Sequence, residues 1–304
     1  MPHVNPFQQP GQWYRGNTHS HSTVSDGQVS LEERFGMYRD AGYGFLVITD
    51  HHQVSDVTPY SSEGFLAISG SEVHPPNPYG GDRYHFVAIN IHEAIPADDL
   101  HPNEAIAAIG EQGGLAVVCH PYWCGHTLND LAPLRGYFAV EVFNATCDGI
   151  GKAYGEAHWD ELLDVAGPVS GIAADDSHHA SRDVFRGWLQ VKARELSVAA
   201  IQEALRTGSF YSTQGPEILD LAVAEKEFTN AKGEAHRAPE VRVKCSPAQR
   251  IVFKGQRSRG RSLSAANGEA LTEAAYPVLR GEKYVRVEIT DAEGKRAWSN
   301  PLYF

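Results

Sequence analysis

The chain has 304 residues, of which 42% are hydrophobic and 21% are charged. These fractions are ordinary for a globular protein that buries a full core, and they exclude a disordered or fibrous chain. Acidic residues number 38 against 26 basic ones, which gives a formal net charge of -12. Such a surface repels a polyanion, so we expect no long nucleic acid as a partner, while a single nucleotide remains open.

The cysteines and the apolar segments indicate where in the cell the protein works. Four cysteines are present without any C-x-x-C spacing, which favours a reducing environment. The N-terminus has no basic start followed by an apolar stretch, and no run of about 18 apolar residues occurs, so neither a signal peptide nor a membrane span is predicted. We therefore expect a cytoplasmic protein that does not bind a membrane, and its oligomeric state is open.

The predicted elements begin with a strand, a helix and a second strand. The first strand covers 13–18, and Ser30 with Glu33 forms a capping box that opens a helix ended by Gly42. The continuously apolar run 45–49 is typical of a buried parallel strand, so these elements form a βαβ unit. The pattern repeats with strands at 65–69, 84–89, 115–119, 138–143 and 168–174 and helices at 102–112, 156–165 and 197–207.

From about Glu217 the apolar segments become short and alternating, separated by turns that contain Gly, Asn and Asp. These segments cover 218–223, 240–245, 250–253, 284–289 and 297–304. The pattern predicts a small antiparallel β-sandwich, and Gln214-Gly215-Pro216 marks its start. We therefore predict an α/β domain over residues 1–215 and a β-sandwich domain over residues 216–304.

The first histidines form an H-x-H pair. His19 and His21 lie one residue apart on a predicted extended segment, so their side chains point to the same side. Both imidazoles can therefore bind one metal ion. The loop that follows carries Asp26, which is within reach as a third ligand.

Histidines and carboxylates recur where the predicted strands end. They are Asp50, His51 and His52; Glu72 and His74; His85; His120; and Asp175, Asp176, His178 and His179. Imidazole and carboxylate together suit zinc, manganese or iron. Because the ends of successive strands meet at one mouth of a barrel, this pattern predicts a multinuclear metal site there.

Six motifs, in this order, resemble those of the PHP (polymerase and histidinol phosphatase) metallohydrolase family. They are His19-Ser20-His21 with Ser25-Asp26-Gly27, Ile48-Thr49-Asp50-His51, Glu72, His85, His120-Pro121 and Asp176-Ser177-His178. The resemblance covers about the first two thirds of the chain. It implies an α/β fold, a distorted (β/α)7 TIM-like barrel, with two or three divalent ions (zinc, manganese or iron) at its mouth.

The resemblance also assigns the ligands by position. It implies one ion held by His19, His21, Glu72 and Asp176, a second by Glu72, His85 and His120, and a third by Asp26, His51 and His178. Glu72 would bridge two ions through its two oxygens. The implied activity is that of a hydrolase in which a metal-bridging hydroxide attacks phosphorus or an acyl carbon.

A phosphoesterase that acts on a small phosphorylated or nucleotide substrate is the favoured activity. Glu72 and Asp26 would act in catalysis as ligands of the ions. Arg83 and Arg182 are candidates to bind the substrate phosphate, because a guanidinium forms paired hydrogen bonds with a phosphate dianion. The proton donor to the leaving group is unassigned among four histidines near the motifs: His52, His74, His126 and His179.

Two alternatives stay open. The segment Trp13-Tyr14-Arg15-Gly16-Asn17, together with the predicted C-terminal β-sandwich, is similar to a branch of PHP-like proteins that includes carbaryl (carbamate ester) hydrolases, in which the hydroxide attacks a carbonyl. In the second alternative, the metal site is vestigial and the chain is a non-catalytic binding protein. Metal content and hydrolytic activity distinguish these possibilities.

Overall fold

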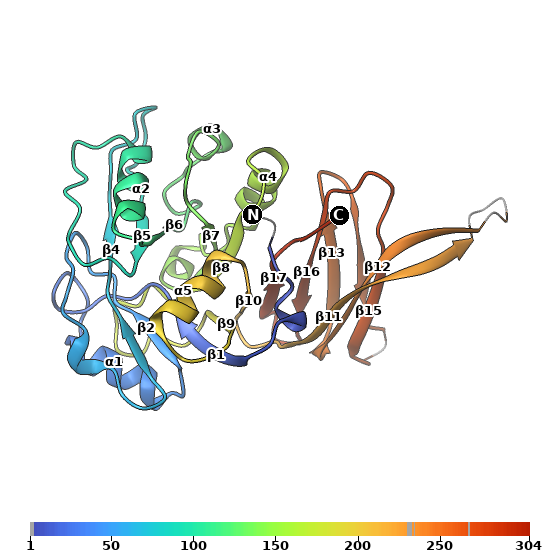
Figure 1. Ribbon diagram of the computed structural model, residues 1–304, viewed down its shortest axis with the longest axis horizontal. Coiled ribbons are helices and arrows are strands. Elements are labelled where there is room, and N and C mark those ends of the chain that lie inside the picture. Colours follow the sequence, from blue (N-terminus) through green and yellow to red (C-terminus); the bar gives the residue numbers. More distant parts are fainter. Residues whose placement is uncertain (1–2, 230–232, 234, 267) are drawn as a thin grey trace.

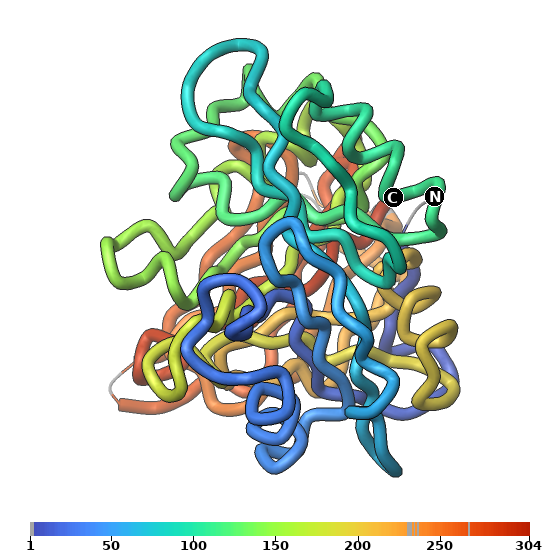
Figure 2. The backbone as a smooth tube through the Cα atoms, turned by 90° about the vertical axis from the view of Figure 1, so that its left-hand side faces the viewer, coloured from blue at the N-terminus to red at the C-terminus, as the bar shows by residue number. Residues whose placement is uncertain are grey.

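The computed structural model describes residues 3–229, 233, 235–266 and 268–304. It has the mixed α/β composition expected from the sequence, with helices in the first two thirds of the chain and strands beyond them (Figure 1). Figure 2 views the molecule from the side of the N-terminal part, which lies in front of the C-terminal strands. None of the described helices is long and apolar enough to cross a membrane.

The predicted βαβ unit is present near the N-terminus. β1 (Gln12–Asn17) pairs in parallel with β2 (Phe45–Val47), and α1 (Leu31–Asp40) connects them. The helix begins as predicted: the Ser30 hydroxyl accepts a hydrogen bond from the Glu33 amide, and the Glu33 carboxylate accepts one from the Ser30 amide.

The chain passes into a second sheet at Ser69. β3 (Leu66–Ile68) extends the parallel sheet beside β2, and β4 (Gly70–Val73) begins only one residue later in another sheet. A single residue leaves no room for a helix between the two strands. The second sheet has five strands: β4, β5 (Phe86–Ile89), β6 (Leu115–Val118), β7 (Ala139–Asn144) and β8 (Ser170–Ala174), in this order.

The predicted distorted (β/α)7 barrel is not confirmed. β5 runs antiparallel to both β4 and β6, and β9 (Trp188–Ala193) runs antiparallel to β1, whereas neighbouring barrel strands are parallel and joined by helices. The segment from β4 to β5 contains Pro75, Pro76 and Pro78, which disfavour a helix. The described helices beyond α1 are α2 (Pro102–Glu111), α3 (Leu128–Leu131), α4 (Glu156–Val165) and α5 (Val198–Arg206), with 3₁₀ turns η1 (Pro6–Gln8), η2 (Thr58–Tyr60) and η3 (Thr146–Ile150).

Two antiparallel sheets make up the C-terminal part. One contains β11 (Ile218–Thr229), β12 (Ala235–Ala248) and β15 (Leu271–Pro277), and the long hairpin of β11 and β12 extends beyond the rest (Figure 1). The other is the C-terminal portion of a longer sheet and contains β13 (Arg250–Gly255), β14 (Gly260–Ser264), β16 (Tyr284–Thr290), β17 (Arg296–Ser299) and β18 (Leu302–Tyr303). Buried apolar side chains of both sheets, among them Val241, Ile251 and Val287, form one core.

One sheet runs through both parts of the chain. β10 (Phe210–Thr213) pairs with β9 on one side and with β17 on the other, so the order β14-β13-β16-β17-β10-β9-β1-β2-β3 is continuous. The predicted boundary between residues 215 and 216 falls just after β10. The division into two domains stays a prediction, because the two parts share hydrogen-bonded strands across it.

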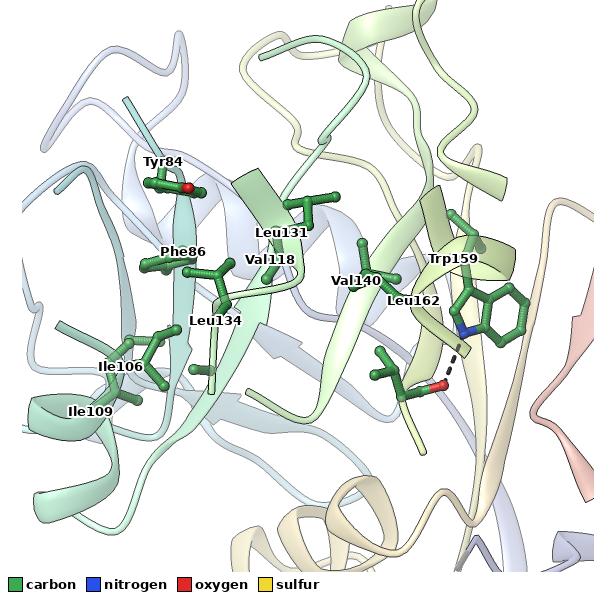
Figure 3. Packing of buried hydrophobic residues seen from close by; sticks show 14 of the residues in the cluster. Tyr84, Phe86, Ile106, Ile109, Val118, Leu131, Leu134, Val140, Trp159 and Leu162 are labelled. Carbon is green, nitrogen blue, oxygen red and sulfur yellow. Dashed lines mark hydrogen bonds between the residues drawn. The ribbon is translucent and has the colours of Figure 1, made fainter. Parts of the chain in front are cut away.

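Helix α4 packs the N-terminal core against the C-terminal sheet. Trp159 is fully buried, and its indole N–H donates a hydrogen bond to the Val169 carbonyl at 2.8 Å (Figure 3). The Arg286 guanidinium of β16 lies 4.3 Å from the centre of the Trp159 ring, and its Nε donates to Asp160 at 2.7 Å. Packing, a cation-π contact and an ion pair therefore join α4 to β16.

We expect Trp159→Phe to lower the free energy of unfolding by about 1 to 3 kcal/mol, since it leaves the buried Val169 carbonyl without its donor. Urea unfolding of the metal-free protein measures this change. Trp123→Phe is the matched control, because Trp123 is 40% exposed. Equal stability of the two variants would contradict the role of the buried indole.

Candidate metal centre

The nine residues predicted as metal ligands come together in one place. They flank the strands of the N-terminal part: His19, His21 and Asp26 follow β1, His51 follows β2, Glu72 lies in β4, His85 precedes β5, His120 follows β6, and Asp176 and His178 follow β8. Their ligand atoms form three overlapping groups, and within each group all the atoms lie within 4.8 Å of one another.

A backbone bridge aligns the first and last segments of the cluster. Ser20 pairs with Ser177 as an isolated parallel bridge. Four of the predicted ligands stand directly before and after these two serines: His19, His21, Asp176 and His178. The bridge holds the two segments side by side, and the rings of His21 and His178 stack across it with centroids 4.2 Å apart.

The first group is buried. His19 Nε2 and His21 Nε2 each lie 3.1 Å from Asp176 Oδ1. The same two nitrogens lie 3.3 and 3.4 Å from Glu72 Oε2. Two imidazoles and two carboxylates therefore converge on one point.

The second group uses the other oxygen of Glu72. Glu72 Oε1 lies 2.6 Å from His85 Nδ1 and 3.3 Å from His120 Nε2. Since Oε2 faces the first group, the carboxylate stands between the two groups. This is the position that the resemblance implies for a bridging ligand.

The third group lies nearer to solvent. Asp26 Oδ1 is 3.4 Å from both His51 Nε2 and His178 Nε2, and the Asp26 side chain is 56% exposed. His21 Nδ1 lies 3.8 Å from the same oxygen, so His21 adjoins this group as well as the first. The third position is therefore the most open of the three.

Asp50 holds the loop that leads to Asp26. The Asp50 carboxylate is buried and accepts hydrogen bonds from the Ser22 amide at 2.8 Å, the Ser22 hydroxyl at 2.7 Å and the Ser25 hydroxyl at 2.7 Å. Within the described ranges it belongs to none of the ligand groups. Asp50 therefore orders the loop and leaves Asp26 free to face the histidines.

Four atoms of the cluster are buried yet make no hydrogen bond to any residue that the structure describes: His19 Nε2, His21 Nε2, His51 Nδ1 and Asp176 Oδ1. A buried polar atom without a partner costs about 1 to 3 kcal/mol, so a group of them indicates a missing ligand. Imidazole nitrogens and carboxylate oxygens are the donors that zinc, manganese and iron accept. The cluster therefore fits a divalent metal ion by its burial and by its donor chemistry.

Charges within the cluster shift the pKa values of its members. Burial alone would raise the pKa of Glu72, but His19 and His85 hold it well below its usual value. Burial alone would lower the pKa of His21, whereas the negative charges of Asp176 and Glu72, 3.1 and 3.4 Å from its Nε2, raise it to about 9. A metal ion that binds here must therefore displace a proton from His21.

A buried carboxylate that the sequence patterns did not reveal supports two of the ligand residues. Glu141 of β7 is 2% exposed; its Oε1 lies 2.7 Å from His19 Nδ1, and its Oε2 accepts a hydrogen bond from the His120 amide at 2.9 Å. Asn144 donates to Glu141 Oε2 at 2.9 Å and to Asp176 Oδ2 at 3.1 Å. A carboxylate at His19 Nδ1 fixes the proton there and leaves Nε2 free to bind. In the sequence, the signal for this residue was a glutamate inside an otherwise apolar predicted strand.

The cluster opens into a small pocket of about 190 Å³. Its walls are Asp26, His51, Glu72, His85, His120, Trp123, Thr146, Cys147, Asp176 and His178. Neither of the arginines predicted to bind phosphate lines it. Arg83 is exposed and donates to the His74 carbonyl at 2.7 Å and to Asp98 at 3.1 Å, while Arg182 is exposed beside Gly149.

The structure separates the histidines considered as proton donors. His126 stacks on a tyrosine ring, His179 Nδ1 lies 2.7 Å from an oxygen of Asp183, and the His52 ring lies edge-on to that of His74 with centroids 4.6 Å apart. His74 differs from the other three, because its Nε2 lies 3.4 Å from Glu72 Oε1. His74 therefore reaches the ligand cluster itself.

Comparisons with known proteins bear on the fold. No protein-family model matches the chain, and no curated protein matches it. A solved structure from Bacteroides vulgatus, a two-domain protein containing a predicted PHP-like metal-dependent phosphoesterase, covers 99% of this chain and 99% of its own, with a TM-score of 0.55 and 18% identity. The chain therefore shares the fold of a PHP-like two-domain protein over nearly its whole length, in agreement with the resemblance seen in its motifs.

Two further solved structures are similar over part of the chain. They are a candidate metal-dependent phosphoesterase from Bifidobacterium adolescentis and an amidohydrolase from Chromobacterium violaceum with bound sulfate and no metal. Each covers 56% of this chain and 89% of its own, with a TM-score of 0.43 and 16% identity.

We expect Glu141→Gln to weaken metal binding by about 10- to 100-fold, because an amide lacks the charge with which a carboxylate fixes the proton on His19 Nδ1. Competition with a chromogenic chelator measures the dissociation constant. Glu240→Gln is the matched control, since Glu240 is 3% exposed and lies in the C-terminal strands. If both variants bind metal as tightly as the unmodified chain, Glu141 does not support the ligands.

Proposed function

We propose that this chain is a metal-dependent hydrolase whose substrate is a small phosphate ester. The observation that carries the proposal is the convergence of nine ligand residues, with Glu72 shared by two of their three groups. Several of their buried atoms have no hydrogen-bonding partner in the described part of the chain. The fold, shared with a two-domain protein that contains a predicted PHP-like metal-dependent phosphoesterase, supports it.

Two or three divalent ions would bind, and zinc, manganese and iron all suit the donors. His19, His21, Glu72 and Asp176 would hold one ion, Glu72, His85 and His120 a second, and Asp26, His51 and His178 a third. Glu72 would serve two ions, since Oε2 faces the first group and Oε1 faces the second. The ions, when bound, would supply an acidified water as the nucleophile and stabilise charge on the substrate oxygens.

The pocket wall offers no activated side-chain nucleophile among the described residues. The Thr146 hydroxyl donates to the Asp176 carbonyl at 2.6 Å and lies 2.9 Å from an oxygen of Asp183, so it is already engaged. Burial raises the pKa of Cys147 well above its usual value, which keeps the thiol protonated and unreactive. These surroundings favour water as the nucleophile.

Charge favours an anionic substrate once the ions are bound. Three of the proposed ligands are carboxylates, Asp26, Glu72 and Asp176, and their three negative charges offset half of the six positive charges of three divalent ions. The remaining positive charge attracts a phosphate dianion without an arginine. A pocket of about 190 Å³ admits the phosphoryl group, and the rest of the substrate would lie outside, beside the half-exposed Trp123.

A carbamate or carboxyl-ester hydrolase is the second candidate. The observation that favours it is the composition of the pocket wall, which within the described residues contains Trp123 but no arginine or lysine. A neutral ester with an aromatic group suits such a wall. The same metal centre would serve this reaction, so the two candidates differ only in substrate.

We expect chelator treatment to abolish hydrolysis of an aryl phosphate, and manganese or zinc to restore it, because the described wall has no activated nucleophile of its own. Elemental analysis should find two or three ions per chain, held in the three ligand groups. Turnover of an aryl carbamate with an inert aryl phosphate would favour the second candidate. A protein that holds no stoichiometric metal and hydrolyses neither compound would overturn both and leave a non-catalytic binding protein.

Glu72→Gln keeps the shape of the side chain but removes its charge. We expect this variant to lose bound metal and to hydrolyse the aryl phosphate at the background rate, because Glu72 belongs to both the first and the second group. Ion content and turnover are measured on the same preparation, with Glu240→Gln as the control. Full metal content and turnover in Glu72→Gln would show that Glu72 does not bridge the ions.

A further inference from the structure

His74 stands outside the nine predicted ligands but lies beside them. It follows β4 directly, and His85 directly precedes β5. Since Val73 pairs with Phe86 in the antiparallel ladder of these strands, His74 and His85 are the next residues along it. Their rings stack with centroids 3.7 Å apart. The antiparallel pairing, which the sequence patterns did not predict, therefore brings His74 to the cluster.

The two oxygens of Glu72 face different imidazoles. Oε2 faces His19, His21 and His51, and Oε1 faces His74, His85 and His120, at distances from 2.6 to 3.4 Å. His74 Nε2 is buried and makes no hydrogen bond to any residue in the described ranges. Its surroundings are therefore those of the nitrogens already proposed as metal donors.

His51 completes a further group with His74. The ligand atoms of His51, Glu72 and His74 all lie within 4.8 Å of one another. His51 Nδ1 lies 3.0 Å from Glu72 Oε2, and it too is buried without a hydrogen bond to the described part of the chain. Two imidazoles and one carboxylate are sufficient to hold an ion such as zinc with a coordination position left open.

His51 is shared between this group and the third one. Its Nε2 lies 3.4 Å from Asp26 Oδ1, whereas its Nδ1 faces Glu72. A neutral imidazole has a lone pair on only one of its two nitrogens. An ion bound through Nδ1 and an ion bound through Nε2 therefore exclude each other.

We propose that His74 is a tenth metal ligand, which with His51 Nδ1 and Glu72 holds a divalent ion as an alternative to the position of Asp26, His51 and His178. The inference rests on the metal centre of the proposed function and adds an ion position that uses one residue beyond its nine. The third ion then has an outer place beside the half-exposed Asp26 and an inner place beside Glu72. An ion displaced from the outer place stays in the centre.

Ion counts in a set of variants test this inference. After loading with zinc and removal of free ions, elemental analysis gives the number of ions per chain. The double variant Asp26→Ala/His178→Ala cannot bind an ion at the outer place. We expect this variant to bind as many ions per chain as the unmodified protein. Adding His74→Gln to this pair should remove one further ion per chain, because a glutamine amide is a poor zinc ligand.

Rescue separates metal binding from folding. In the Asp26→Ala/His178→Ala background, His74→Cys should retain the ion, because a thiolate also binds zinc. His92→Gln is the control, since His92 is exposed and belongs to none of the groups found among the described residues.

Three outcomes would count against these ideas, and they are distinguishable. Equal ion counts with and without His74→Gln in the background pair would overturn the role of His74, and so would a failure of His74→Cys to retain the ion. An unmodified chain that binds no zinc, manganese or iron would instead overturn the proposed function.

Discussion

The structure depends on the burial of one carboxylate, Glu72, among histidines. Its side chain is 1% exposed, and a carboxylate at that depth keeps its charge only when cationic or hydrogen-bonding groups surround it. The local geometry provides those groups: the chain leaves the first sheet at Ser69 to form β4, and the bridge between Ser20 and Ser177 aligns two pairs of ligands across from it. The charge on Glu72 therefore depends on the strand ends that bring the histidines to it.

Two of the ligand residues have an unusual backbone conformation. His120 has a φ of 23° and Asp176 a φ of 53°, both in the left-handed region, which costs about 1 to 3 kcal/mol for a residue other than glycine. Hydrogen bonds hold both in place, since the His120 amide donates to Glu141 and the Asp176 carbonyl accepts from Thr146. The fold thus accepts strain at the ends of β6 and β8, where side chains must turn toward the cluster.

Local signals in the sequence predicted much of this arrangement. The structure contains the helix predicted from the capping box at Ser30 and Glu33 and the strand predicted from the apolar run at 45–49. It also brings together the ionisable residues that the sequence placed beside strand ends. Their role in metal binding stays a prediction. Contacts between distant strands gave no such signal. The pairing of β4 with β5 and the contact of Glu141 with a histidine 122 residues away depend on the whole topology, so local periodicity could not reveal them.

β10 lies in the middle of the ten-stranded sheet, with β9 on one side and β17 on the other, and all four of its residues are buried. Cutting the chain at residue 215 would remove β17 and expose β10 as an open edge, which invites pairing with a second molecule. The C-terminal strands therefore protect the rest of the protein against aggregation, whatever else they do. A chain shortened at residue 215 would keep every proposed ligand, but the edge of β10 would be open to pairing with strands of other molecules.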